Sequence, residues 1–354
     1  MLVQQKAGDA FAQNTAKAGK HSTDNDRHYQ WRMVTSWPKK FPGLGMAPEY
    51  FAEAVRRMSN GRLDIQVHGA GEIVPALGVF DAVSLGSVEM GHSAAYYWKG
   101  KIPAAQFFTA IPFGLNAQEM NAWLYYGGGL ELWREVYEPY NLVPFPGGNT
   151  GVQMGGWFNR EINSVADLQN LKMRIPGFGG EVLNRLGGTA VNIPGGEIFT
   201  ALQTGVIDAT EWVGPYNDLT FGLHQAAQYY YYPGWHEAGP TLEFTVNKKA
   251  WNSLPKDLQA IVEIAARATN QNMLDEYTAR NNAALIELKE KHGVSVRAFP
   301  KDVLRELKKV SQQVLKEQVQ SDAISKKVYE NWSVFRKNVE QYHDVSEKAY
   351  YNAR

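Results

Sequence analysis

The chain has 354 residues, with 36 basic and 36 acidic side chains and no cysteine. A net charge of zero excludes the basic surface that nucleic-acid-binding proteins need, and the lack of cysteine excludes disulfides, thiolate metal sites and cysteine nucleophiles. No run of about 18 apolar residues, the length of a membrane-spanning helix, is present, and the chain is long enough for two lobes with a core each.

The first 29 residues are polar and poor in large apolar side chains, and they lack the apolar core of a signal peptide. We interpret residues 1–29 as a disordered leader that remains after a signal peptide has been removed. Ordered structure is expected to begin where the polar stretch gives way to alternating apolar residues.

Between residues 29 and 92 the sequence alternates between strand and helix patterns. Strands are predicted at 29–36, 63–67 and 88–92, and helices at 47–58 and 78–86. This order predicts a mostly parallel sheet covered by helices.

The same pattern restarts near Gly151. Strands are predicted at 152–159, 172–175, 189–193 and 206–210, and helices at 164–168, 180–186 and 197–203. Two successive α/β units indicate two lobes with a cleft between them.

A long helix is predicted from residue 255 to residue 292, where apolar residues recur at helical spacing without an internal proline or glycine. Such a helix would be roughly 50 to 60 Å long, more than one small lobe can cover, so we expect it to bridge both lobes. The alternative is two shorter helices that are broken near 269–271.

The C-terminal part, residues 301–354, is predicted to be helical and charged. It carries an apolar stripe with a period near 3.6, formed by Val328, Tyr329, Trp332, Phe335 and Val339. The stripe either packs onto the chain's own lobe or joins a second copy, and the pattern alone favours neither.

These observations predict a division of the chain into lobes. The first lobe comprises residues 30–150 and 239–275, the second comprises 151–238 and 276–320, and a helical extension covers 321–354.

Arg174 is the first candidate for a binding residue, because it ends a predicted strand just before Pro176 and Gly177. Ligands of open α/β sheets bind beyond the carboxyl ends of strands, and a guanidinium there can hold a carboxylate through two parallel hydrogen bonds. The alternative is an ordinary surface arginine at a strand end.

Oxygen donors follow other strand ends and turns, namely Gln153, Glu211, Trp212 through its carbonyl, and Glu237. Together they can cage a hard cation, although a glutamate in a loop is usually just solvated. Motifs of common hydrolases and nucleotide-binding enzymes are absent, and His92, His224 and His236 lack metal-binding spacing, which favours structural roles for them.

The segment LKMRIPGFGGEVLNRLGGTAVNIPGGEIFTALQTGVIDATEW, whose second residue is Lys172, resembles the solute receptors of tripartite ATP-independent periplasmic (TRAP) transporters, the DctP-like family. The matching features are the strand with arginine before proline at Arg174–Pro176 and the helix-to-strand turn at 201–208. The similarity extends from about Trp31 to the C-terminal helices. It implies a two-lobed α/β clamshell that closes near Gly151 and Ala238, with one long helix across both lobes.

The stretches GNTGVQMGGW, DATEWVGPYND and YYYPGWHEAGP are similar to the subgroup that binds 2-oxo or 2-hydroxy monocarboxylates, such as pyruvate or lactate, together with a metal cation. The resemblance implies that Arg174 holds the substrate carboxylate and that Asn149 and Tyr97 contact the ligand. It assigns the cation, sodium or calcium, to Gln153, Glu211, the Trp212 carbonyl and Glu237.

Charge counting supports a cation. Glu211, Glu237 and an anionic substrate bring three negative charges into the closed cleft, and Arg174 compensates one of them. A divalent ion would compensate the other two. We expect Trp212, Tyr97 and Phe178 to wall off a short side chain on the substrate.

The resemblance also implies a periplasmic location, a membrane permease as partner, and pairing of two copies by exchange of C-terminal helices. Two other classes of protein are alternatives. The first is a metal-dependent hydrolase or lyase that uses Glu211, Glu237 and His236. The second is an interaction or sensor protein with the same fold.

Overall fold

The computed structural model describes residues 27–354. The expected leader, residues 1–29, lies outside the described residues except for its last three, and the third of these, Tyr29, already begins the first strand. None of the helices in the described part of the chain combines the length and the hydrophobicity of a membrane span.

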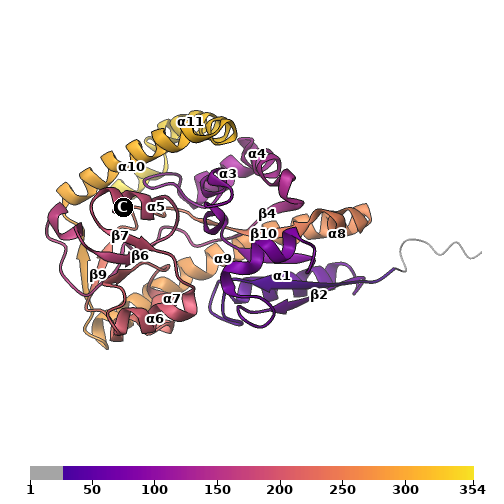
Figure 1. Cartoon of the computed structure of the whole chain (residues 1–354), viewed down its shortest axis with the longest axis horizontal. Helices are drawn as coiled ribbons and strands as arrows, with labels where there is room; N and C mark the ends of the chain where they lie inside the picture. Colours follow the sequence, from indigo (N-terminus) through magenta and orange to yellow (C-terminus); the bar gives the residue numbers. More distant parts are fainter. Residues whose placement is uncertain (1–26) are drawn as a thin grey trace, which may run out of the picture.

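The molecule has two lobes, each built on its own sheet (Figure 1). The first sheet has the strand order β2-β1-β3-β10-β4. Its strands are β1 (Tyr29–Thr35), β2 (Leu63–His68), β3 (Met90–Ser93), β4 (Leu142–Asn149) and β10 (Thr241–Asn247). The helices of this lobe are α1 (Met46–Met58), α2 (Val79–Ser84), α3 (Ala117–Tyr126), α4 (Gly129–Tyr137) and α8 (Lys248–Ser253).

The second sheet has the order β11-β9-β5-β8-β6-β7. Its strands are β5 (Gly156–Phe158), β6 (Lys172–Arg174), β7 (Thr189–Val191), β8 (Ala209–Thr210), β9 (Tyr229–Tyr232) and β11 (Ser295–Ala298). The helices of this lobe are α5 (Gly177–Arg185), α6 (Gly195–Gln203) and α7 (Pro215–Thr220). The predicted two-lobed α/β fold is thus present, and the lobe boundaries given above stay predictions.

The long helix is a single element, α9 (Lys256–Glu290), which contacts α1 and β4 in the first lobe and α7 in the second. The alternative of two helices is wrong, because residues 269–271 lie inside an unbroken helix. The Thr269 hydroxyl donates to the Ala265 carbonyl, 2.8 Å away and four residues earlier, and both residues are buried.

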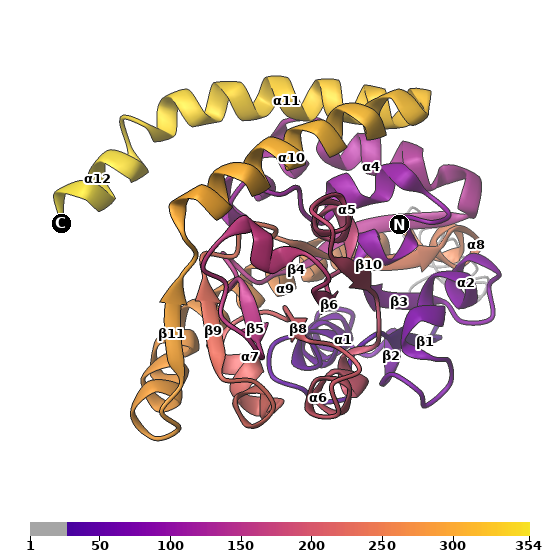
Figure 2. The same ribbon diagram turned by 60° about the vertical axis from the view of Figure 1, so that its left-hand side comes forward.

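The C-terminal helices cross from one lobe to the other (Figures 1 and 2). Helix α10 (Lys301–Ser321) packs against α5 of the second lobe, whereas α11 (Ala323–His343) packs against α3 and α4 of the first. Val328 and Trp332 of the apolar stripe are buried, and the other three stripe residues pack against the same core, so this chain covers its own stripe. Helix α12 (Glu347–Ala353) projects from the body in Figure 2.

The strands predicted between residues 29 and 92 pair in parallel, as expected, but both sheets also contain antiparallel strands that the sequence did not predict. Strand β10 inserts antiparallel between β3 and β4, and β5 runs antiparallel to β8 and β9. The strand predicted at 152–159 shortens to β5, because the backbone N–H groups of residues 153–155 donate to the carbonyls of Glu237, Val213 and Tyr231. The helix predicted at 164–168 is a single 3-10 turn.

Each lobe buries one carboxylate between an indole and a phenol. In the first lobe, Glu243 accepts hydrogen bonds from Trp98 Nε1 at 2.6 Å and the Tyr137 hydroxyl at 2.8 Å. In the second, Asp218 accepts from Trp157 Nε1 at 3.0 Å and the Tyr230 hydroxyl at 2.7 Å. Burial raises the pKa of each carboxyl to about 7, against the effect of these hydrogen bonds.

We predict that the stability of the fold decreases as the pH rises from about 4.5 to 7. In this window the folded protein keeps a proton on Glu243 that the unfolded chain has released, so ionisation costs the folded state about 3 kcal/mol. Denaturant titrations of the wild type and of Glu243→Gln at pH 5 and pH 8 test this. The variant should show a smaller loss of stability between the two pH values, and an identical loss would contradict the assignment.

Candidate ligand and cation site

A cavity with about 300 Å³ of empty space, including the part open to solvent, lies between the two lobes. The first lobe contributes Trp37, Leu44, Ala94, Tyr96, Tyr97 and Thr109, and the crossing segments contribute Thr150, Gln153, Glu237, Pro240 and Leu242. The second lobe contributes Arg174, Trp212 and Val213. The wall is therefore aromatic, with charged and amide groups gathered on one side.

Arg174 reaches this cavity from the carboxyl end of β6. The chain turns there through Gly177, whose φ of +61° favours glycine and where an added Cβ would lie in tight contact with Tyr96 at 3.3 Å. The buried guanidinium forms an ion pair with the Glu211 carboxylate and donates to the Tyr97 hydroxyl at 3.1 Å. Burial alone would lower the pKa of Arg174, but Glu211, Tyr97, Tyr96 and Glu237 together outweigh burial and the pKa is raised.

Glu211 follows β8 and is completely buried. Its Oε1 atom pairs with Arg174, whereas its Oε2 atom has no hydrogen-bond partner and lies 3.4 Å from His236 Nε2. A buried carboxylate oxygen without a donor is costly, so this atom is suited to accept a cation.

Glu237 belongs to the tight turn at 233–240 and is also buried. Burial and the charge of Glu211 raise its pKa well above the usual value, while Arg174 and a hydrogen bond from Tyr96 act in the opposite direction. Two carboxylates therefore share one guanidinium in a poorly hydrated cleft. A positive ion would relieve the excess negative charge.

Gln153 and Trp212, which line the same cavity, offer two further oxygens. The Gln153 amide donates through Nε2 to the Thr150 hydroxyl at 3.2 Å, which leaves its buried Oε1 atom without a partner. No residue in the range 27–354 donates a hydrogen bond to the main-chain carbonyl of Trp212. Unpaired amide, carboxylate and carbonyl oxygens are the ligands that sodium and calcium take, so the residues present fit a hard cation.

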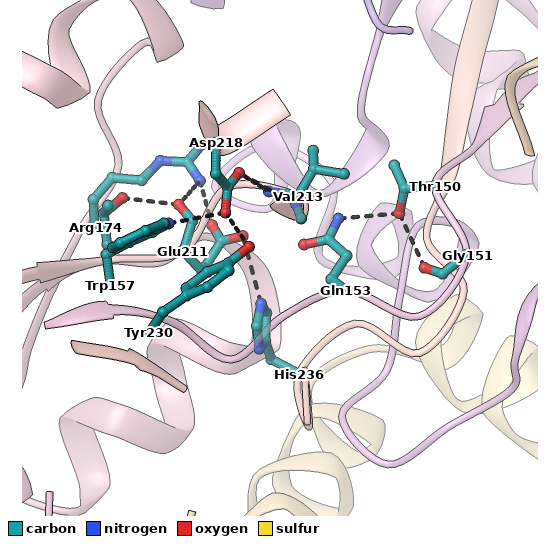
Figure 3. Close-up of polar contacts among 12 residues, drawn as sticks. Thr150, Gly151, Gln153, Trp157, Arg174, Glu211, Val213, Asp218, Tyr230 and His236 are labelled. Carbon is teal, nitrogen blue, oxygen red and sulfur yellow. Dashed lines mark hydrogen bonds and ion pairs between the residues drawn. The ribbon is translucent and has the colours of Figure 1, made fainter. Parts of the chain in front are cut away.

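His236 also belongs to the cluster, and the sequence reading had grouped it with Glu211 and Glu237 only under the hydrolase or lyase alternative. It is buried, neither ring nitrogen has a hydrogen-bond partner, and it points toward Glu211 (Figure 3). Glu211, His236 and Glu237 each offer a ligand atom within 4.8 Å of one another. The purely structural role predicted for His236 therefore does not account for its place in this cluster. Its position next to Glu237 in the sequence was the signal that could have indicated this place.

Two predicted ligand contacts lie outside the lining of the cavity. Asn149 donates to the Gly239 carbonyl at 3.0 Å and accepts from the Gly151 N–H at 2.9 Å, so its side chain braces the segments that join the lobes. Phe178 packs edge-on against Phe107, with 5.2 Å between ring centroids. Tyr97 lines the cavity and accepts the hydrogen bond from Arg174.

Several lining residues were not anticipated from the sequence. Trp37, Tyr96 and Leu242 come from three separate segments, and Trp37 meets Trp212 of the other lobe with 6.1 Å between ring centroids. Nothing in their local sequence distinguishes them from core aromatic and aliphatic residues.

Comparison with known proteins agrees with this geometry. Residues 33–322 match the family model described as bacterial extracellular solute-binding protein, family 7. The chain is 49% identical over 323 residues to a monocarboxylate 2-oxoacid-binding periplasmic protein of Nostoc sp., which covers 91% of this chain and 88% of that protein.

Two solved structures are similar over nearly their whole length. A TRAP periplasmic solute-binding protein from Colwellia psychrerythraea with bound calcium and pyruvate superposes with a TM-score of 0.90 at 46% identity, covering 93% of this chain and 100% of that one. One from Pseudoalteromonas atlantica with bound sodium and pyruvate gives a TM-score of 0.90 at 45% identity, with the same coverage.

We predict that calcium stabilises the protein and that Glu237→Gln weakens this effect. At a concentration about a hundredfold above its Kd, the ion should raise the midpoint of thermal unfolding by about 5 °C. Differential scanning calorimetry with and without calcium measures the shift, and Glu53→Gln on the exposed face of α1 is the matched control. An equal calcium shift in Glu237→Gln would mean that the ion binds elsewhere.

Proposed function

Because the chain belongs to the bacterial extracellular solute-binding proteins of family 7, we propose that it delivers a small 2-oxo or 2-hydroxy monocarboxylate, captured with a cation, to a TRAP membrane permease. The relatives named above are solute receptors and not enzymes, so the hydrolase or lyase alternative is not pursued. The periplasm is the proposed location.

One observation carries the proposal, namely that Arg174, Gln153, Trp212 and Glu237 line one cavity, and that Glu211, which pairs with Arg174, keeps a buried oxygen without a partner. The guanidinium supplies the positive partner for the substrate carboxylate. Gln153, Glu211, the Trp212 carbonyl and Glu237 would hold the cation. A 2-oxo or 2-hydroxy acid suits this arrangement because its carboxylate and C2 oxygen together can chelate a metal ion, whereas acetate lacks the second oxygen.

The walls of the cavity favour a short substrate. Trp37, Tyr96 and Trp212 form rigid walls, and each added methylene that fails to fit costs a ligand about 1 to 3 kcal/mol. The pyruvate bound to both solved relatives supports a ligand of this class.

We predict that pyruvate binding depends on a cation. Isothermal titration calorimetry in a calcium buffer should give tight binding. After chelation of divalent ions and replacement of sodium by choline, affinity should fall by about a hundredfold, because the two carboxylates and the substrate then lack a counter-ion. Acetate is the control ligand and should bind weakly in both buffers. Equal pyruvate affinity in the two buffers would contradict the cation-assisted mode.

We predict that Arg174→Lys weakens pyruvate binding at least tenfold, because an ammonium keeps the charge but loses the planar fork. Lysine is preferred to alanine here because alanine would leave Glu211 buried and unpaired, which itself destabilises the fold. Arg185→Lys on α5, which is exposed and pairs with Glu317, is the control. Calorimetry that shows unchanged affinity for Arg174→Lys would exclude Arg174 as the anchor.

We propose in addition that two copies pair through the C-terminal helices. Helix α12 contributes no buried residue, and Tyr350 and Tyr351 on it are exposed. Sedimentation velocity should then give a particle of twice the chain mass of 39.6 kDa. A single species with the mass of one chain would contradict pairing.

A further inference from the structure

Asp218 is buried and does not line the cavity. Its carboxylate accepts hydrogen bonds from the backbone of the site. Its Oδ2 atom accepts from Trp157 and Tyr230, as described above. Its Oδ1 atom accepts from the backbone N–H of Val213 at 3.3 Å and from that of Gly214 at 3.2 Å (Figure 3). One side chain therefore fixes the turn that follows Glu211 and Trp212.

The bond to Val213 determines the direction of the Trp212 carbonyl. The N–H of Val213 and the C=O of Trp212 belong to one planar trans peptide, so they point in opposite directions. Asp218 holds the N–H, and the carbonyl must therefore point away from Asp218. Trp212 and Val213 both line the cavity, and the carbonyl receives no hydrogen bond from any residue of the described chain.

The turn and its support are held from other sides as well. The Val213 carbonyl accepts from the Met154 N–H at 3.1 Å, which fixes the next peptide. Helix α7, which carries Asp218, is bound to the long helix α9. The Tyr216 N–H donates to Asn281 Oδ1 at 3.0 Å, and the Tyr277 hydroxyl donates to Asn217 Oδ1 at 2.8 Å. Asp218 is therefore held in place by hydrogen bonds between α7 and α9 that do not involve the turn.

We propose that Asp218 is a positioning residue that directs the Trp212 carbonyl at the cation without contacting the ion or the substrate. This inference rests on the cation-assisted function proposed above and adds a residue to it. A carbonyl fixed before the ion arrives needs no reorganisation on binding, so Asp218 contributes to cation affinity rather than to recognition of the anion.

The test uses Tb³⁺, a luminescent substitute for calcium, whose lifetimes in H₂O and D₂O report the number of water molecules on the ion. Asp218→Ala removes the support, and Asp218→Glu moves the acceptor by one methylene. In both variants we expect an additional water on Tb³⁺ and about a tenfold loss of calcium affinity.

Tyr230→Phe is the matched control, because it removes a partner of Oδ2 and leaves the two bonds to the turn in place. It should lower the unfolding midpoint without changing the water count. Circular dichroism establishes which variants are folded. The inference is overturned if folded Asp218→Ala or Asp218→Glu keeps the wild-type water count and calcium affinity.

The same measurements separate this inference from the proposed function. If the wild type binds pyruvate equally well without a cation, the proposed function fails and the positioning role fails with it. If the wild type requires the cation and the folded Asp218 variants bind it as the wild type does, only the positioning role is wrong.

Discussion

The site depends on the buried ion pair between Arg174 and Glu211. Removing both groups from water is costly, and the structure offsets this cost by placing them at the ends of adjacent parallel strands, β6 and β8. Glu237 adds a second buried carboxyl group close to this pair, and when both carboxyl groups are ionised the cleft carries more negative than positive charge. The proposed binding of a cation together with an anionic chelating ligand rests on this imbalance.

The frame around this pair is held together on both sides of the cavity. On one side, Phe41 of the first lobe stacks on Phe221 of the second with 4.3 Å between ring centroids. On the other, Lys99 of the first lobe forms an ion pair with Glu181 in the middle of α5. The lobes are therefore in contact around the cavity, and α9 supports both, so the polar groups of the site sit on fixed elements.

Sequence periodicity located β6, β8 and α9, because each of these elements is defined by its own local pattern, and strand ends marked Arg174 and Glu211 as candidates. It did not locate the antiparallel strand β10, whose position depends on pairing with β3 and β4 far away in the chain. His236 was placed only in part. Its position next to Glu237 associated it with the glutamates, but the local pattern did not show that it is buried against Glu211. The place of a residue such as Trp37 in the cavity likewise depends on tertiary contacts, which local sequence patterns do not show.

The central place of β10 also constrains the order in which the protein can mature. Until residue 247 has been synthesised, β4 has no partner strand, and the sheet of the N-terminal lobe consists only of β2, β1 and β3. Residues 27–150 alone therefore lack the strand that completes their sheet. Formation of this lobe requires the chain to pass through the other lobe and return, which makes folding dependent on contacts far apart in the sequence.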